Sequence, residues 1–166
     1  VCAYASDRGI NLALEVFDRA IDKKCLVGPA DSAREIAKRV KATHPSFGLM
    51  VDLSHIPLLS ESPAEALQPV KDHLVHIHIG NAYMDDQGDP AYGDMHPRFG
   101  YPGGANDVPE LVAFLDELFK IGYLKRDASS RAAISFELKP VGSENPRTMI
   151  ANGQRKLVEA WSQVTA

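Results

Sequence analysis

The sequence has few cysteines and no excess of basic side chains, and each shortage excludes a class of protein. Its 166 residues include two cysteines, Cys2 and Cys25, whose spacing fits neither a metal-binding pair nor a dense disulfide framework. We therefore expect free thiols in a reducing compartment, with the cytoplasm as the expected location. The formal net charge of −4 argues against a large nucleic-acid interface, which normally needs a basic excess. No apolar run approaches the roughly 18 residues that a membrane-spanning helix needs.

What is present is the composition of a globular domain with a sizeable core. Hydrophobic residues make up 45% of the chain and charged residues 24%, and the length suits a single domain over residues 1–166. The opening stretch VCAYASDRGINLALEV starts without methionine and leads directly into a buried strand. We therefore expect the chain to be the second half of a larger domain.

Four short segments share an alternating pattern, with large apolar residues on one face and small or polar residues on the other. In LVHIHIG (74–80), Val75, Ile77 and Ile79 are predicted to face a helix, and His76 and His78 to face the opposite side. The other three segments are NLALEV (11–16), GLMVDLSH (48–55) and AISFEL (133–138). On every segment the small or polar face ends in a side chain that can bind a metal ion.

Helical patterns lie between and after these strands, at residues 30–41, 62–71, 108–121 and 145–164. Asp31 or Ser32 is the expected N-cap of the first helix, and Pro69 interrupts the second. Strand–helix alternation predicts parallel strands in an α/β domain. An open doubly wound sheet would be apolar on both faces, so the polar face favours the inside of a (β/α)8 TIM barrel. Four strands would supply about half of such a barrel.

The carboxyl ends of the predicted strands carry acidic or imidazole side chains, namely Glu15, Asp52, His78 and Glu137. Reactive groups of (β/α)8 barrels sit at these ends. Three carboxylates and an imidazole suit one divalent ion, Mn²⁺, Mg²⁺ or Co²⁺, and also accept Zn²⁺. Each residue alone could equally be a helix cap or an ion-pair partner, and His76 either supports His78 or is a core histidine. Their joint occurrence on four strands favours the metal site.

A long stretch rich in glycine, proline, aspartate and aromatic residues follows the histidine-bearing strand. It covers residues 81–107 and contains Asp94 and His96. Because loops of this length are usually functional or disordered, we expect an ordered flap over the site.

Four stretches carry a family resemblance, namely LALEVFDR, GLMVDLSH, HIHIGN and SFELKP, in this order. With them the chain resembles the xylose-isomerase-like TIM-barrel superfamily, which includes sugar isomerases and epimerases, inosose dehydratases and an apurinic-site endonuclease branch. The stretches look like the fifth to eighth strands of that fold. The resemblance therefore implies that the chain supplies the last four βα units.

The resemblance also implies roles for individual residues. The implied metal ligands are Glu15, Asp52, His78 and Glu137. Glu15 and Glu137 would also exchange protons with a sugar, and His55 would contact the substrate, or a second metal as in the endonuclease branch. The implied activity is a sugar, sugar-phosphate or keto-polyol isomerase or epimerase working through a metal-stabilised enediolate. Two carboxylates on opposite sides of a carbon can remove and return its proton, while the cation stabilises the enediolate oxygens.

Three positions depart from the sugar epimerases of this superfamily. Asn81 and Met84 stand where an acidic residue and an arginine often follow the metal histidine, and Ile21 replaces a second glutamate. We expect the sugar contacts to differ, with Arg98 or Lys139 replacing the missing cation. The other candidate substrate contacts are His55, His76, Asp94 and His96.

Two other reactions stay open at this stage. Dehydration of an inosose-type polyol would use the same ion and base. Alternatively, Asp94 and His96 could join His55 in a multinuclear zinc site that hydrolyses phosphodiesters, as in AP endonucleases. The acidic charge and the lack of a basic stretch interleaved with aromatic residues argue against that substrate.

The expected partner is a small sugar, with no nucleic acid and no membrane. A half barrel exposes strand edges and apolar surface, which tend to pair with another chain. We therefore expect either a homo-oligomer or a longer polypeptide that supplies the missing N-terminal half-barrel.

Overall fold

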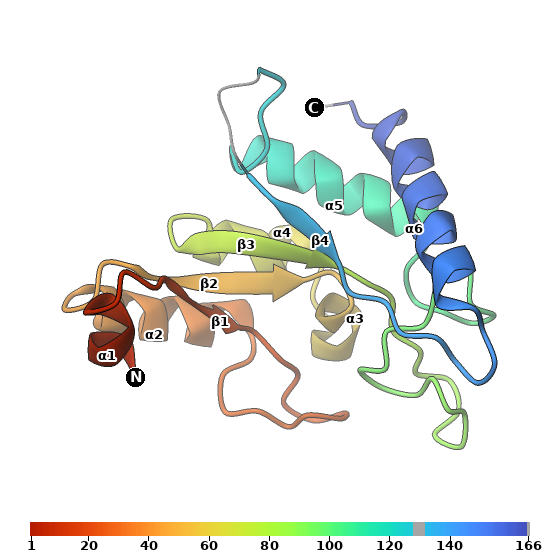
Figure 1. Cartoon of the computed structure of the whole chain (residues 1–166), viewed down its shortest axis with the longest axis horizontal. Coiled ribbons are helices and arrows are strands. Elements are labelled where there is room, and N and C mark those ends of the chain that lie inside the picture. The colour runs from red at the N-terminus through yellow and green to blue at the C-terminus, as the bar shows by residue number, and fades with distance from the viewer. Residues whose placement is uncertain (128–131, 166) are drawn as a thin grey trace.

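Four parallel strands form one sheet in their chain order, β1 (Leu12–Glu15), β2 (Phe47–Asp52), β3 (Leu74–Ile79) and β4 (Ile134–Phe136). The structure is a computed structural model that describes residues 1–127 and 132–165. Figure 1 shows the arrowheads pointing toward one end of the molecule, where the green loop of residues 80–107 lies. Each strand neighbours the next in sequence, as in a βα barrel, whereas a doubly wound sheet reverses its strand order. The predicted parallel α/β sheet is confirmed.

The helices are α1 (Cys2–Ser6), α2 (Ala30–Lys41), α3 (His55–Leu59), α4 (Pro63–Leu67), the 3-10 helix η1 (Gln68–Val70), α5 (Val108–Lys120) and α6 (Pro146–Trp161). Local capping explains where several of them begin. Asp107 and Glu110 form a capping box at the start of α5, and Asn145 accepts two backbone N–H groups at the start of α6. The prediction that Asp31 or Ser32 caps α2 is wrong, because this helix starts directly after Pro29 without a side-chain cap.

The core lies between one face of the sheet and the helices. Leu49 and Ile77 from the central strands are fully buried, as are Leu115 and Leu118 of α5. Each such side chain stabilises the fold by about 1.5–3 kcal/mol. The opposite face carries the smaller and polar residues. Packing of the other face against the helices fixes the positions of the carboxyl ends of the strands.

A register irregularity in β3 changes the predicted alternation. Leu49 pairs with Leu74, and the next residue of β2, Met50, pairs with His76, so that Val75 is left out of the pairing. Val75 is 50% exposed and lies on the polar face beside Gly48, where an added Cβ would come within 2.3 Å of its side chain. The prediction that Val75 faces a helix is therefore wrong. The bulge ends before Ile77, and beyond it the predicted alternation holds.

Both outer strands have one edge without a strand partner in the described part of the chain, since β1 pairs with β2 and β4 with β3. Among the described residues no helix combines the length and the apolar character needed to cross a bilayer.

Candidate metal centre

The four predicted ligands lie together at the carboxyl ends of the strands. Glu15 and Asp52 are the last residues of β1 and β2, His78 is the penultimate residue of β3, and Glu137 directly follows β4. One ligand atom from each lies within 4.8 Å of the others. The backbone holds this arrangement, because Asp52 pairs in register with His78 and the N–H of Glu137 donates to the carbonyl of Ile79 at 3.0 Å. Sheet geometry therefore brings together side chains that are far apart in sequence.

The cluster contains carboxylate oxygens without hydrogen-bond donors. Nδ1 of His78 is hydrogen bonded to Oε2 of Glu137 and lies 3.8 Å from Oδ2 of Asp52 and 3.9 Å from Oε1 of Glu15. The latter two oxygens are buried and have no partner, whereas Oδ1 of Asp52 accepts the N–H of Ser54 at 2.7 Å. A buried oxygen without a partner costs about 1–3 kcal/mol. Three carboxylates and one imidazole are a donor set that a divalent cation satisfies, so the residues fit such an ion.

The charges of this cluster oppose one another. Burial raises the pKa of Asp52, whose side chain is fully inaccessible. Burial also raises the pKa of Glu15 to about 7, and the neighbouring carboxylates of Glu137 and Asp52 act in the same direction. Burial and like charge thus both disfavour the ionised carboxylates, and a cation placed among them would remove this penalty.

A second group of side chains adjoins the first. Asp52, His55 and His96 offer ligand atoms within 4.8 Å of one another. Oδ1 of Asp94 lies 2.9 Å from Nε2 of His55 and 3.0 Å from Nε2 of His96, and Nδ1 of His55 lies 2.8 Å from the carbonyl oxygen of Val16. His96 has a φ of 49°, a left-handed conformation that costs about 1–3 kcal/mol in a non-glycine residue and is concentrated at functional sites.

The ionisation of this second group follows from its hydrogen bonds. Burial alone would raise the pKa of Asp94, but the hydrogen bonds from His55 and His96 outweigh it and hold the pKa far below its usual value. Burial alone would lower the pKa of His55, but the hydrogen bond to Asp94 prevails and raises it to about 9. The pKa of His96 is raised for the same reason. Oδ1 of Asp94 is therefore the shared partner of the two imidazoles.

The other predicted contacts lie around these two groups. His76 shares a hydrogen bond of 3.1 Å with Oγ of Ser135, and its ring meets that of His78 edge-on at 5.1 Å between centroids. Arg98 donates to Oε1 of Glu144 at 2.9 Å and to the carbonyl of Gly100 at 2.6 Å, so its guanidinium ties loops together. Lys139 is exposed and lines a cavity of about 210 Å³ next to the flap.

Two asparagines connect the loop of residues 81–107 to the strand ends, and the sequence marked one of them, Asn81, only as a departure from the epimerase pattern. Asn81 is fully buried and accepts the N–H of Asn106 at 2.7 Å, and the amide of Asn106 donates to the carbonyl oxygens of Leu53 and Gly80. The sequence pattern does not predict these contacts, because their partners are backbone atoms brought close by the fold.

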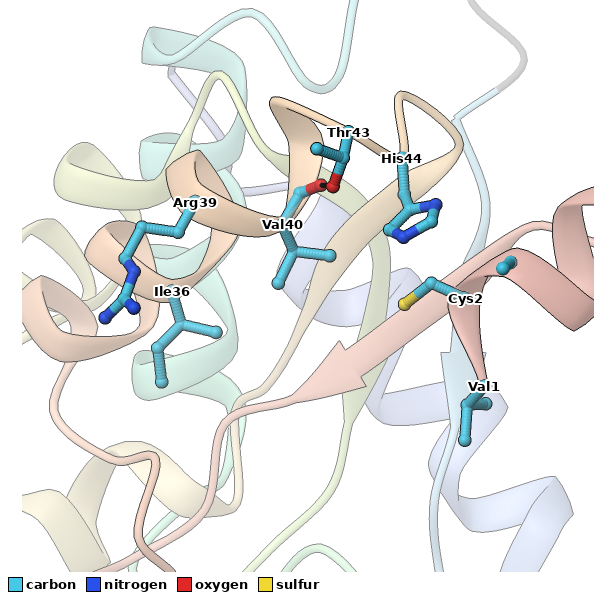
Figure 2. Close-up of a pocket in the computed structure, with 8 residues that line it drawn as sticks. Val1, Cys2, Ile36, Arg39, Val40, Thr43 and His44 are labelled. Atoms are coloured by element: carbon cyan, nitrogen blue, oxygen red, sulfur yellow. Dashed lines mark hydrogen bonds between the residues drawn. The ribbon is translucent and has the colours of Figure 1, made fainter.

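A cavity of about 550 Å³ lies away from this cluster, between the start of the chain and α2 (Figure 2). Val1 and Cys2 line one side, and Ile36, Val40 and His44 line the other. None of the candidate metal ligands contributes to it, so cavity size does not locate the site. Cys2 and Cys25 are both free thiols, as predicted.

The fold and the site define a parallel α/β-barrel protein with a carboxylate and histidine cluster at its strand ends. A family model described as xylose isomerase-like TIM barrel matches residues 1–157, and the chain belongs to this family. No curated protein sequence gives a significant match.

Solved structures share the fold at low sequence identity. D-psicose 3-epimerase from Clostridium cellulolyticum H10, with D-tagatose, matches 99% of this chain with a TM-score of 0.63 and 15% identity. L-ribulose 3-epimerase matches 98% with a TM-score of 0.65 and 16% identity. A xylose isomerase-like TIM barrel/4-hydroxyphenylpyruvate dioxygenase fusion protein matches 98% with a TM-score of 0.69 and 20% identity. The chain spans 53%, 52% and 24% of these chains, respectively, which confirms the predicted half-barrel.

Proposed function

We propose that this chain carries the metal-binding half of a sugar isomerase or epimerase that depends on one divalent ion, Mn²⁺, Mg²⁺, Co²⁺ or Zn²⁺. The observation that carries the proposal is the convergence of Glu15, Asp52, His78 and Glu137 within 4.8 Å, with buried carboxylate oxygens that lack donors. The ion would supply the positive charge that stabilises the oxygens of an enediolate. Similarity to the D-psicose and L-ribulose 3-epimerase structures supports this class of reaction.

The residues divide into two roles by their place in the sheet. Glu15 and Glu137 come from the two outer strands, so their carboxylates approach the cluster from opposite sides. One would remove the proton next to a carbonyl and the other would return it on the opposite face. Asp52 and His78 come from the central strands and would hold the ion. Candidate contacts with sugar hydroxyls are His55, His76, Asp94, His96, Arg98 and Lys139.

Solvent-deuterium exchange tests this function. The chain is incubated in D₂O with Mn²⁺ and a panel of ketoses, and deuterium on carbon is measured by NMR. Incorporation that is lost in both Glu15→Gln and Glu137→Gln supports the proposal. Glu35→Gln is the matched control, because this carboxylate is surface-exposed on α2. Incorporation that persists in both site variants contradicts the assigned roles.

The second group of side chains favours one competing function. Asp52 belongs both to the first group and to the group with His55 and His96, and a carboxylate shared in this way could bridge two zinc ions of a phosphodiesterase. Cleavage of an abasic-site oligonucleotide with more than one zinc per chain would favour this alternative. Release of water from an inosose-type ketone would instead favour the dehydratase.

The proposed partner is a small sugar, in a reducing compartment such as the cytoplasm. Nucleic acid and membrane are not part of the proposal. The free edges of β1 and β4 support pairing with further strands, from a second copy or from the rest of a barrel.

A further inference from the structure

A cavity of about 320 Å³ lies between the first turns of α6 and the loop of residues 81–107, where these two segments run side by side (Figure 1). Asn152 of α6 fixes one wall, because its amide donates to the carbonyl oxygen of Phe99 at 2.9 Å. Arg98 and Glu144 line the cavity from the two loops, and Thr148 and Arg155 line it from α6. None of the four candidate metal ligands contributes to it. The cavity is therefore a polar surface separate from the cluster.

One positive charge of this cavity is uncompensated. Its charged side chains are Arg98, Arg155 and Glu144. The carboxylate of Glu144 is already engaged, since Oε1 accepts Nε of Arg98 at 2.9 Å and Oε2 accepts the N–H of Val141 at 3.0 Å. Among the described residues, no hydrogen bond or ion pair engages the guanidinium of Arg155. An unpaired cation thus lines a concave surface of a chain whose formal net charge is −4.

The free donors of the cavity suit a phosphate group. Nε and Nη1 of Arg98 donate to Glu144 and to the carbonyl of Gly100, which leaves Nη2 available. Thr148 and Arg155 are seven residues apart, so their side chains leave α6 from the same face, about two turns apart. Guanidinium groups bind phosphate through charge-assisted hydrogen bonds, and the three acceptor oxygens of a phosphate ester can engage more of these donors than the two oxygens of a carboxylate.

A short segment joins the cavity to the candidate metal centre. Arg98 follows His96 by two residues, so their Cα atoms are at most about 7.6 Å apart. Nε2 of His96 lies 3.5 Å from Oε1 of Glu137. The loop after β4 follows the same path, because the N–H of Lys139 donates to the carbonyl oxygen of His96 at 2.7 Å. The cavity therefore adjoins the metal centre along residues 96–98.

We propose that the cavity of Arg98, Thr148 and Arg155 binds the phosphate group of a phosphorylated sugar, whose carbonyl end would lie at the candidate metal centre. The inference rests on the proposed function for the sugar and its carbonyl, and on the cavity alone for the phosphate. Arg155 supplies the uncompensated charge, and Glu144 holds Arg98 in place. A sugar that ends in a neutral hydroxyl would leave this charge without a partner, so the cavity would select phosphorylated substrates.

A titration of the full chain with inorganic phosphate tests the cavity without relying on turnover. EDTA is present, so that no bound metal can hold the phosphate, and ¹⁵N NMR gives the affinity and the amides that shift. We expect shifts at Thr148 and Asn152, and binding about tenfold weaker in Arg155→Gln because a charge-assisted hydrogen bond is lost. Arg147→Gln is the matched control on the same helix and should bind like wild type, since Arg147 is exposed and does not line the cavity.

A second titration separates a phosphorylated sugar from free phosphate. With Mg²⁺ present, D-fructose 6-phosphate should bind about tenfold or more tightly than either D-fructose or inorganic phosphate, because it would reach the cavity and the metal centre together. Arg155→Gln should remove most of its advantage over D-fructose. Arg155 is exposed and has no described partner, so its substitution is compatible with the fold.

The outcomes separate this inference from the proposed function. Equal phosphate affinity in wild type and Arg155→Gln overturns the cavity assignment, and so does a loss confined to Lys139→Gln, which would place phosphate in the neighbouring cavity that Lys139 lines. D-fructose 6-phosphate that binds no more tightly than inorganic phosphate overturns the substrate class. If deuterium exchange fails with every ketose while phosphate binding still depends on Arg155, the proposed function falls and the phosphate site stands.

Discussion

The Oδ2 atom of Asp52 lies 3.8 Å from Nδ1 of His78, on strands that pair in register at these two residues. This oxygen is buried and has no hydrogen-bond donor among the described residues. The two central strands thus place an imidazole beside a buried carboxylate oxygen that a cation would satisfy.

Asp52→Asn should abolish tight metal binding. The amide removes one negative charge and replaces a carboxylate oxygen with a weaker metal ligand. Affinity for Mn²⁺ should therefore fall about 100-fold or more. This loss is at least as large as the loss caused by removing a residue that only supports a metal ligand. Isothermal titration calorimetry measures this change. Glu35→Gln, on the exposed face of α2, should bind like wild type. Equal affinity in Asp52→Asn and wild type would place the ion elsewhere.

Metal removal should destabilise the sheet. An ion that binds only the folded chain adds about 2.7 kcal/mol of unfolding free energy at a concentration 100 times its dissociation constant. We expect the Tm to rise when Mn²⁺ is added, to fall again with EDTA, and to be unaffected by either in Asp52→Asn. Hydrogen exchange should slow on β1 and β4, because their ligands tie the outer strands to the centre. A Tm shift in Asp52→Asn equal to that of wild type would contradict this account.

Gly80→Ala should disturb the site through packing. An added Cβ would lie 2.6 Å from the carbonyl oxygen of Glu137 and 3.1 Å from Nδ1 of His96, so the backbone after β4 must move. We expect a loss of about 1–3 kcal/mol of unfolding free energy and at least a tenfold loss of Mn²⁺ affinity. Gly88→Ala is the control, since its closest neighbour is the end of the exposed Asp86 side chain at 3.3 Å. Unchanged affinity in Gly80→Ala would show that the close approach is not needed.

Asp18→Asn should reduce stability in a pH-dependent way. Burial alone would raise the pKa of Asp18, but hydrogen bonds from the backbone N–H groups of Lys23, Asp22 and Ile21 prevail and lower it. The stabilisation is therefore fully present above the unfolded value of 3.8 and is lost as the pH falls through the folded pKa. At pH 7 the variant should lose about 1–2 kcal/mol of unfolding free energy.

Urea unfolding at pH 7 and below pH 3.8 measures this difference, which should shrink at the lower pH. Asp31→Asn is the control, because its side chain is 76% exposed and its ion pair contributes little. A difference between Asp18→Asn and wild type that is independent of pH would mean that the charge of Asp18 does not stabilise the loop.

The strands and the convergence of Glu15, Asp52, His78 and Glu137 could be anticipated because the information is local. Alternation assigns each side chain to a face, and parallel pairing places the strand ends at a common edge. Val75 shows the limit of this reasoning. Its displacement results from a bulge against β2, and neither the residue nor its neighbours in sequence signal that change of register.

The contact between Lys23 and Asp94 could not be anticipated from the sequence. It depends on the path of two loops, and each path is set by backbone hydrogen bonds such as those to Asp18 and from Asn106. Arg98 shows the reverse case. Its charge made it a candidate contact for the sugar, but its guanidinium is hydrogen bonded to Glu144 and to the carbonyl of Gly100. In both cases a charged residue forms an ion pair, and only the fold selects its partner.

All four candidate ligands lie between residues 15 and 137, on consecutive strands of one sheet. If the proposed function holds, its reactive groups form a module that can be inherited as a unit. Lineages could then exchange or remodel the complementary strands, and with them the choice of sugar, while leaving the proposed ion and proton donors untouched.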